Sequence, residues 1–449
     1  MADSLRPMTH ASALALLGGP VEHRRTAPKY PRFTAAAYDR VREALDRGPM
    51  QGLSKGHPII AELEERLAAY HDVELALATS SGHGALQSAL IGLEITGGDE
   101  VLTSPYSWGA SVSCILHNGA VPVFVDVSPE TGLIDPSALA AGLTSRTRAI
   151  LVPHLYGQPA DMTAIMSFAE AHGLVVVEDG SQAHGARHRG RRVGGFGEAG
   201  AFSTNGVKPL ATTEGGYLVT RVADVYWKAT ISGQHAGRGE LIGRASEPGF
   251  PDELRQHIDS MVYTYRPNIV TALLTLDRLP YVDAENAARR RNASALFAAL
   301  DGVGSVSWPS HDAQDECVYH MVTLNFDAEH AGVSRDTYLA ALNAEGVPAV
   351  AYVANGLHRS PRLSPSYDGP RVMWTETLRR AGVDPNAAEL PGCDEKVARS
   401  IEIPWNHFED DPESMASLAR AFAKLEEGLD HLRRHERSGV AARSETASA

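Results

Sequence analysis

The sequence has few cysteines, and their spacing argues against two classes of protein. Cys114, Cys317 and Cys393 lie far apart in a chain of 449 residues. They form neither an even-numbered disulfide framework nor a metal-type pair. Isolated thiols of this kind are typical of a cytosolic protein, in which cysteines stay reduced. His184 and His188 are four residues apart, but they lie outside the predicted helices and so do not form a helical metal pair. We therefore predict no metal site; the histidines considered for one are His184, His188, His235 and His358.

Long apolar runs and an excess of basic residues are also missing. The chain holds 41 Lys and Arg against 55 Asp and Glu, a formal net charge of -14. Nucleic-acid and membrane-surface binders need a clustered basic face, so we predict neither partner. No segment approaches the roughly 20 apolar residues that span a bilayer. The short apolar run 11–17 ends in Gly18-Gly19-Pro20 rather than in a small-residue cleavage site. These absences predict a cytoplasmic protein.

The length of the chain predicts two associated domains, because 449 residues exceed one ordinary domain. We place the boundary near residue 285, with a large domain over 14–285 and a smaller C-terminal domain over 286–434. Residues 1–13 and 435–449 are expected to be flexible tails.

Apolar runs alternate with helical patterns through the first domain, and the spacing of its apolar residues predicts a helix that begins at Pro58. Strands that are apolar throughout indicate a mainly parallel sheet covered by helices on both faces, hence an α/β fold. In such sheets ligands lie beyond the carboxyl ends of the strands. The predicted strands are Leu75–Ala78, Glu100–Thr103, Val121–Val127, Arg148–His154, Leu174–Glu178, Ala199–Ser203 and Tyr217–Thr220, followed in the second domain by Val318–Phe326 and Pro348–Val353. Further helices are predicted over 284–300 and 411–432.

Two charged residues next to predicted strands are candidates for chemistry. Asp179 ends an apolar strand, where an unpaired carboxylate is costly. It therefore caps a helix or pairs with a buried cation. Lys208 lies in a loop of small and polar residues between two strand signals. A lysine is usually a solvated surface charge, but a desolvated lysine has a lowered pKa and condenses with aldehydes.

Together these segments resemble the DegT/StrS family of sugar and cyclitol aminotransferases. The family pattern is Glu-Asp-x-x-Gln-Ala-x-Gly-Ala, then Ser-x4-Lys, then Glu-Gly-Gly. Here residues 178–186 fit the first part, Ser203 precedes Lys208 by five positions, and Glu214 follows it by six. Similarity extends over about residues 14–430. The resemblance implies a fold-type I pyridoxal-phosphate (PLP) enzyme, with a mainly parallel seven-stranded sheet flanked by helices in the large domain and a smaller C-terminal α/β domain.

The resemblance also implies the contacts of the cofactor ring. Lys208 corresponds to the lysine that holds PLP as a Schiff base and, once displaced, moves the proton. Asp179 corresponds to the partner of the pyridine nitrogen, which keeps the ring protonated and electron-withdrawing. Gln182 corresponds to the group that binds the phenolic oxygen. Trp108 corresponds to the aromatic residue stacked on the ring, although core packing explains a tryptophan equally well.

The implied phosphate contacts contain two departures from the family. Gly82, His83 and Gly84 lie at a strand-to-helix junction, where backbone N–H groups bind anions, and Ser203 adds a hydroxyl. His83 replaces the usual threonine. The family completes each site with an asparagine of the neighbouring subunit, where this chain has Thr264, which offers one donor instead of two. The resemblance thus implies a homodimer with shared active sites.

The function implied is transfer of an amino group from glutamine or glutamate to a keto-sugar or keto-cyclitol. Segments 14–20 and 28–31 are most similar to the cyclitol and aminoglycoside-pathway branch, which serves secondary-metabolite biosynthesis. Sugar-dehydrating relatives carry histidine at the lysine position, so Lys208 excludes them. Two alternatives stay open at this point. One is another PLP reaction (elimination, decarboxylation or oxidation), and the other is a non-catalytic PLP-binding regulator, against which the complete set of Lys208, Asp179 and Gln182 argues.

Overall fold

The large domain is built on a seven-stranded sheet in the order β1-β9-β8-β5-β4-β2-β3. The computed structural model describes residues 13–47, 57–234, 238, 250–370 and 372–446. Only β9 runs antiparallel to its neighbours, so the mainly parallel sheet of an α/β fold is confirmed. The strands are β1 (Leu75–Thr79), β2 (Glu100–Thr103), β3 (Val121–Phe124), β4 (Thr147–Pro153), β5 (Val175–Asp179), β8 (Ala199–Ser203) and β9 (Gly216–Thr220).

Helices cover both faces of this sheet because successive strand residues point to opposite sides. Leu151 and Val177 pack with α3, α4 and α6 on one face. Ile150 and Val176 pack with α5 on the other face, where α2 and α8 cover β1 and β9. The helices of this region are α1 (Ala35–Asp46), α2 (Pro58–His71), α3 (Gly82–Gly92), α4 (Ala110–His117), α5 (Met162–His172), α6 (Ala223–Gly233) and α8 (Ile269–Arg278), and a short hairpin pairs β6 (Arg187–His188) with β7 (Arg191–Arg192).

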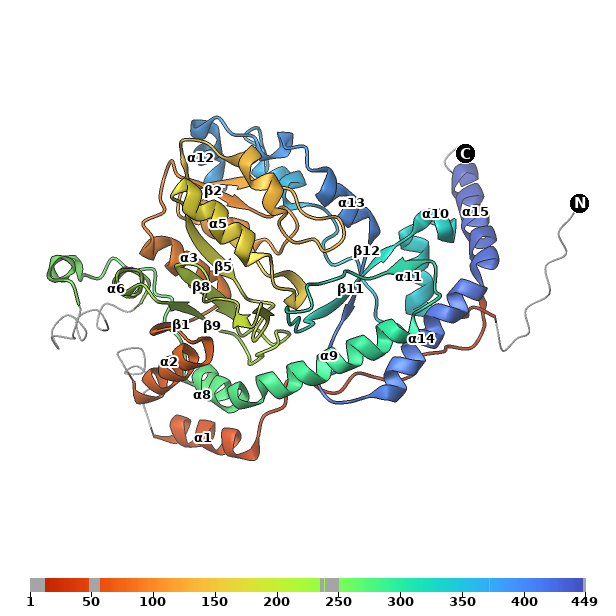
Figure 1. Cartoon of the computed structure of the whole chain (residues 1–449), viewed down its shortest axis with the longest axis horizontal. Coiled ribbons are helices and arrows are strands. Elements are labelled where there is room, and N and C mark those ends of the chain that lie inside the picture. The colour runs from red at the N-terminus through yellow and green to blue at the C-terminus, as the bar shows by residue number, and fades with distance from the viewer. Residues whose placement is uncertain (1–12, 48–56, 235–237, 239–249, 371, 447–449) are drawn as a thin grey trace, which may run out of the picture.

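A second, smaller core follows the long helix α9 (Val282–Ala299), which runs from α8 toward the second sheet (Figure 1). The boundary proposed at residue 285 falls in the first turn of this helix. The second sheet is antiparallel, in the order β10-β11-β12. The strands and helices that follow α9 are β10 (Val306–Ser307), β11 (Met321–Phe326), α10 (Ala328–Ala331), α11 (Arg335–Ala344), α12 (Trp374–Ala381), α13 (Pro391–Arg399), β12 (Ser400–Pro404), α14 (Pro412–Glu427) and α15 (Leu429–Thr446).

The strand predicted over Pro348–Val353 is wrong. Only Val350 pairs with a strand, through a single bridge to Glu402. Two residues later the N–H of Tyr352 donates to the side-chain carboxylate of Glu402 instead of a backbone carbonyl, at 2.9 Å. A side chain thus takes the place of the next rung of the ladder, and the predicted strand does not form.

The chain also differs from expectation near its two ends. From Leu14, the first segment packs in the core of the small domain, and the N–H of Ala15 donates to the carboxylate of Glu345 at 2.7 Å. Helix α15 continues to Thr446, where we expected a tail from residue 435. Its Glu436 accepts hydrogen bonds from the N–H and hydroxyl of Ser334, which hold the helix against the small domain. Residues 1–12 and 447–449 lie outside the described residues.

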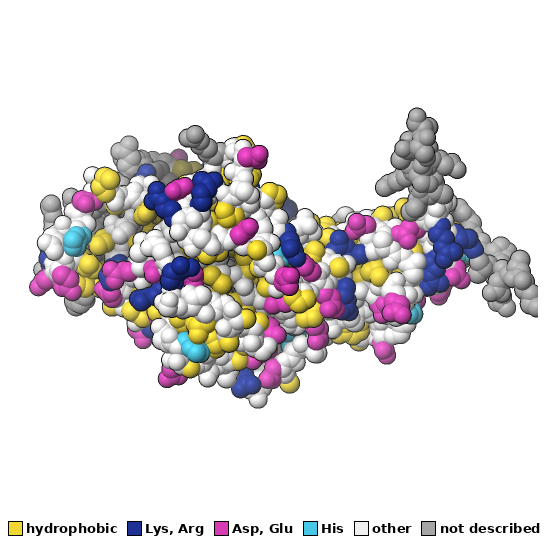
Figure 2. Space-filling model, turned by 90° about the horizontal axis from the view of Figure 1, so that it is seen from above, with side chains coloured by type: hydrophobic (Ala, Val, Ile, Leu, Met, Phe, Trp, Pro, Cys, Tyr) yellow, Lys and Arg dark blue, Asp and Glu magenta, His cyan; other side chains and the backbone are white. Residues whose placement is uncertain are grey.

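The described helices include none long and apolar enough to cross a membrane. On the face shown in Figure 2, Lys and Arg side chains are interspersed with Asp and Glu.

A buried carboxylate fixes the turn that precedes β8. Glu178 is fully buried and accepts hydrogen bonds from the N–H groups of Gly194, Phe196 and Gly197 at 2.6, 2.7 and 2.9 Å. His154 Nε2 is a fourth partner at 3.1 Å. Burial raises the pKa of Glu178, but the hydrogen bond and charge of His154 and these N–H groups outweigh it and hold that pKa below its ordinary value. The glycine turn therefore binds an anion that belongs to the protein itself.

We expect Glu178→Gln to lower the free energy of unfolding by about 3 kcal/mol, because an amide NH₂ would face backbone donors in a buried site. Since the pKa of Glu178 is depressed, its contribution is present near neutral pH and is lost as pH falls through that pKa. Urea denaturation at pH 7 and pH 4 measures both effects. Glu170→Gln, at an exposed position of α5, is the control; equal losses for both variants would contradict the prediction.

Candidate active site

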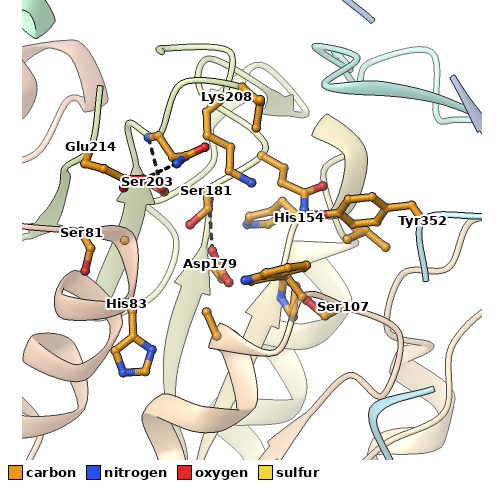
Figure 3. A pocket seen from close by; sticks show the side chains of 18 residues that line it. Ser81, His83, Ser107, His154, Asp179, Ser181, Ser203, Lys208, Glu214 and Tyr352 are labelled. Atoms are coloured by element: carbon orange, nitrogen blue, oxygen red, sulfur yellow. Dashed lines mark hydrogen bonds between the residues drawn. The ribbon is translucent and has the colours of Figure 1, made fainter. Parts of the chain in front are cut away.

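A cavity of about 430 Å³ opens where the carboxyl ends of β4, β5 and β8 meet the start of α3 (Figure 3). The strand register brings these ends together, since Asp179 lies beside Pro153 of β4 and Ala201 of β8. Seven of the nine predicted site residues line the cavity, namely Gly82, His83, Trp108, Asp179, Gln182, Ser203 and Lys208. Gly84 and Thr264 do not line it.

Asp179 presents its carboxylate to the cavity from the last position of β5. The side chain is 8% exposed, and its Oδ2 accepts a hydrogen bond from the Ser111 hydroxyl at 2.7 Å. Its Oδ1 accepts from the N–H of Ser181 at 3.1 Å. The residues after Asp179 form turns rather than a helix, so the helix-cap interpretation is wrong. Two donors hold the carboxylate oriented, which is how a buried acid is kept available for a cationic partner.

Lys208 reaches the same cavity from the loop between β8 and β9. Burial lowers the pKa of its amine, and the charge of Asp179 acts in the opposite direction. The loop is held from outside by Tyr30, whose hydroxyl donates to the carbonyl of Lys208 at 3.1 Å. A lowered pKa increases the fraction of neutral amine, the form that attacks an aldehyde.

The side-chain amide of Gln182 is oriented by a backbone N–H group, that of Tyr156. Its Oε1 accepts the N–H of Tyr156 at 2.8 Å, which leaves the NH₂ end of the amide to donate. Tyr156 adopts a left-handed backbone with φ of 59°, a conformation uncommon for a bulky residue and worth a functional interpretation. The amide therefore enters the site as a hydrogen-bond donor.

Trp108 is 63% exposed and forms part of the cavity wall. Its ring centroid lies 6.2 Å from that of Tyr352, at an interplanar angle of 34°. The core-packing interpretation of Trp108 is therefore wrong. An indole exposed in a cavity is available to cover a planar ligand.

The start of α3 supplies backbone donors, because the first amides of a helix lack intrahelical acceptors. Ser81 caps the helix by accepting the N–H of Gly84 at 3.0 Å, which explains why Gly84 is not available to the cavity. A Cβ at Gly82 would lie 2.5 Å from that of Ser203, so only glycine fits there. The amides of Gly82 and His83 thus remain at the cavity beside the Ser203 hydroxyl.

The imidazole of His83 is engaged by α4. Its Nε2 lies 3.0 Å from Nδ1 of His117, and its Nδ1 lies 3.4 Å from the Ser113 hydroxyl. Burial and the neighbouring His117 lower the pKa of His83, against the opposite effect of Asp179. The histidine that replaces threonine therefore joins two helices through its side chain.

Thr264 lies on an exposed loop outside this chain's own cavity. The loop is fixed on both sides of Thr264: Tyr263 N–H donates to Ser232 at 2.9 Å and Tyr265 N–H to Gly233 at 2.6 Å. Thr264 has φ of 60°, which is unfavourable for a β-branched residue and easier for asparagine. Its role in the site of a neighbouring subunit stays a prediction.

Three contributors to the site were missed in the sequence. Ser111 lies three residues after Trp108, and helical spacing could have indicated that it faces the same side. His154 follows β4 directly, as Asp179 ends β5, so the strand-end rule applied to it too. Tyr352 gave no signal, because it belongs to the segment predicted as a strand.

A second cavity of about 490 Å³ adjoins the first and shares His83, Trp108 and Ala110 with it. Its other side is formed by α4 and by Leu357, Ser360, Arg362, Leu363 and Trp374. Among the described residues no group of three or more His, Cys, Asp or Glu side chains could hold a metal ion. His235, one of the histidines considered earlier, lies outside the described residues.

The residues of the first cavity fit a PLP-sized group. A lysine amine and a carboxylate face the space, an amide donor and an exposed indole flank it, and helix amides with a hydroxyl form one end. Each group matches one functional part of the cofactor: aldehyde, pyridine nitrogen, phenolic oxygen, ring face and phosphate. Fold and site together define the class of fold-type I PLP aminotransferases.

The chain belongs to the DegT/DnrJ/EryC1/StrS aminotransferase family, whose sequence profile matches residues 33–384. It is 32% identical over 436 residues to the L-glutamine:2-deoxy-scyllo-inosose aminotransferase of Streptomyces lividus, covering 94% of this chain and 99% of that one. It is 37% identical over 437 residues to a putative L-glutamine:3-amino-2,3-dideoxy-scyllo-inosose aminotransferase of Streptoalloteichus tenebrarius, covering 94% and 100%. The structure resembles that of an aminotransferase from Psychrobacter cryohalolentis, with a TM-score of 0.77, 26% identity and coverage of 90% and 100%. The resemblance stated from the motifs is confirmed.

We expect Ser111→Ala to weaken PLP binding by about tenfold, because a hydrogen bond to a charged group contributes roughly 1.5 kcal/mol. The Asp179 carboxylate would lose the donor that orients it. Equilibrium dialysis of PLP against the apoprotein measures the change. Ser88→Ala, at a buried serine of α3 outside the cavity, is the control. Unchanged affinity in a folded Ser111→Ala protein would show that Ser111 does not support the site.

Proposed function

We propose that this chain is a PLP-dependent aminotransferase that moves an amino group from glutamine or glutamate to a keto-sugar or keto-cyclitol. The observation that carries the proposal is the amine of Lys208, with its lowered pKa, facing the same cavity as the oriented carboxylate of Asp179. Among family members, two of the most similar relatives are named for L-glutamine and an inosose. This similarity supports glutamine as the donor and a cyclitol ketone as the acceptor, in aminoglycoside-type biosynthesis.

When bound, PLP supplies an electron sink that weakens bonds to the donor's Cα. Lys208 would hold the cofactor through its amine and, once that amine is free, would accept the proton from Cα of the donor. Asp179 would keep the pyridine nitrogen protonated. Gln182 would donate its amide hydrogen to the phenolic oxygen, and Trp108 would cover the ring and exclude water from one face.

The phosphate contacts follow from the start of α3. The amides of Gly82 and His83 and the hydroxyl of Ser203 bind the anion, and the positive end of the helix favours its charge. Thr264 of a second copy adds one donor, so the protein acts as a homodimer with shared sites. We propose a cytoplasmic location, which agrees with the reduced cysteines expected there.

Borohydride reduction of the protein loaded with PLP should fix a pyridoxyl group on Lys208. Peptide mapping by mass spectrometry locates the label. Lys396 is a built-in control, because it is a fully buried lysine whose pKa burial lowers to about 8, although Glu402 acts in the opposite direction. Lys208→Ala should lose the label and the visible absorbance, whereas a label on Lys396 would contradict the assignment.

Glutamine should convert the PLP form to the pyridoxamine-phosphate form and release a keto acid. Stopped-flow absorbance follows the loss of the visible band, and the keto acid is measured in the same sample. Lys208→Ala is the matched variant and should not react. A wild type that binds PLP but leaves its spectrum unchanged with both glutamine and glutamate would favour a different PLP reaction.

A further inference from the structure

A second fully buried carboxylate, Glu402, lies behind the cavity on β12 of the small domain. The chemistry proposed above does not use it. Burying a carboxylate costs several kcal/mol unless hydrogen bonds and a cation offset the loss of water. The partners of Glu402 therefore indicate what the chain gains from keeping a charge there.

Three donors bind the Glu402 carboxylate. Its Oε1 accepts the hydroxyls of Tyr106 at 3.3 Å and Thr323 at 3.2 Å. Its Oε2 accepts the N–H of Tyr352 at 2.9 Å. The compensating cation is Lys396, whose Nζ donates to the Thr323 hydroxyl at 3.2 Å. Each oxygen thus has a hydrogen-bond partner. Burial raises the pKa of Glu402, while the N–H of Tyr352 and the charge of Lys396 act in the opposite direction.

The hydrogen bond between Glu402 and Tyr106 is connected to Gln182 through Tyr156. The hydroxyls of Tyr106 and Tyr156 lie 3.1 Å apart, and both rings are fully buried. The N–H of Tyr156 is the group that orients the Gln182 amide at 2.8 Å. Glu402, Tyr106, Tyr156 and Gln182 therefore form a continuous chain from the small domain to the cavity.

Two further walls of the cavity depend on the same carboxylate. Tyr106 precedes Trp108 by two residues, so fixing the Tyr106 ring fixes the loop that carries the indole. The N–H contact to Tyr352 fixes the backbone of the residue whose ring faces that indole across 6.2 Å. The Glu402 side chain thereby fixes, directly or through Tyr106, the segments that carry Trp108, Gln182 and Tyr352.

We propose that Glu402 is a positioning residue that fixes three walls of the cofactor cavity from the small domain, through Tyr106, Tyr156 and Tyr352. The inference rests on the proposed function for its effect on PLP. Its structural part, the ordering of the cavity walls, applies to the apoprotein alone.

The test is Glu402→Gln, which keeps the shape of the side chain but replaces one accepting oxygen with a donor. Either the Tyr352 N–H or the hydroxyls of Tyr106 and Thr323 then lack an acceptor. In the apoprotein, hydrogen exchange of the peptides that contain Tyr156 and Tyr352 should accelerate by about tenfold, as expected when a protecting hydrogen bond is lost. In the loaded protein the visible circular dichroism of PLP should change, and kcat should fall more than KM for glutamine changes.

Glu345→Gln is a closely matched control. Glu345 is also a fully buried glutamate of the small domain; it accepts the N–H of Ala15 at 2.7 Å and pairs with Lys424 at 2.8 Å. Its partners do not reach the cavity. We expect both variants to lose thermal stability, but only Glu402→Gln to change exchange at the cavity walls and the PLP signal.

Equal effects of the two variants on exchange and on the PLP signal would overturn the proposal and leave Glu402 a structural residue. If Glu402→Gln does not fold, Tyr106→Phe removes the hydroxyl that joins Glu402 to Tyr156 and keeps the carboxylate. It should accelerate exchange at Tyr156 and leave Tyr352 protected; unchanged exchange at both would also overturn the proposal. A wild type that binds no PLP would refute the proposed function, whereas the exchange measurements would still decide the role of Glu402.

Discussion

The site depends on keeping the amine of Lys208 and the carboxylate of Asp179 together in one largely buried cavity. Either group alone would be expensive to bury, and each makes the other less so. Parallel strands make this pairing possible, because their carboxyl ends share one edge of the sheet and the loop after β8 returns over it. Ser111 and Ser181 hold the acid, while Tyr30 holds the backbone of the lysine.

The parts of the site that lie within short motifs could be predicted from the sequence. Asp179, Gln182 and Lys208 follow or connect strands whose apolar pattern is clear, so strand, loop and chemistry appear in one stretch of chain. Tyr352 and Glu402 could not be found in this way. Tyr352 lies in an apolar segment that fits a strand, and only the tertiary contact with Glu402 turns it away from a ladder. A buried Glu402 in an alternating apolar strand gives no sign of its three partners, which come from distant segments.

The two departures from the family pattern have different physical meanings. At position 83 the proposed cofactor contact is a backbone amide, so the side chain is free to change, and the imidazole instead connects α3 to α4 through His117. At position 264 the backbone itself is demanding, because a left-handed conformation favours asparagine over a β-branched residue. The threonine is retained in a loop held on both sides by hydrogen bonds. The histidine at position 83 adds a contact between two helices, whereas the threonine at position 264 has an unfavourable backbone conformation.

The segment of residues 13–30 reaches both domains. Leu14 and Ala15 are fixed in the small domain, whereas Tyr30 contacts the backbone of Lys208 in the large one. One segment therefore has its anchor in the small domain and, at Tyr30, a contact with the lysine loop of the large domain. The two domains are thus joined through residues 13–30 as well as through α9.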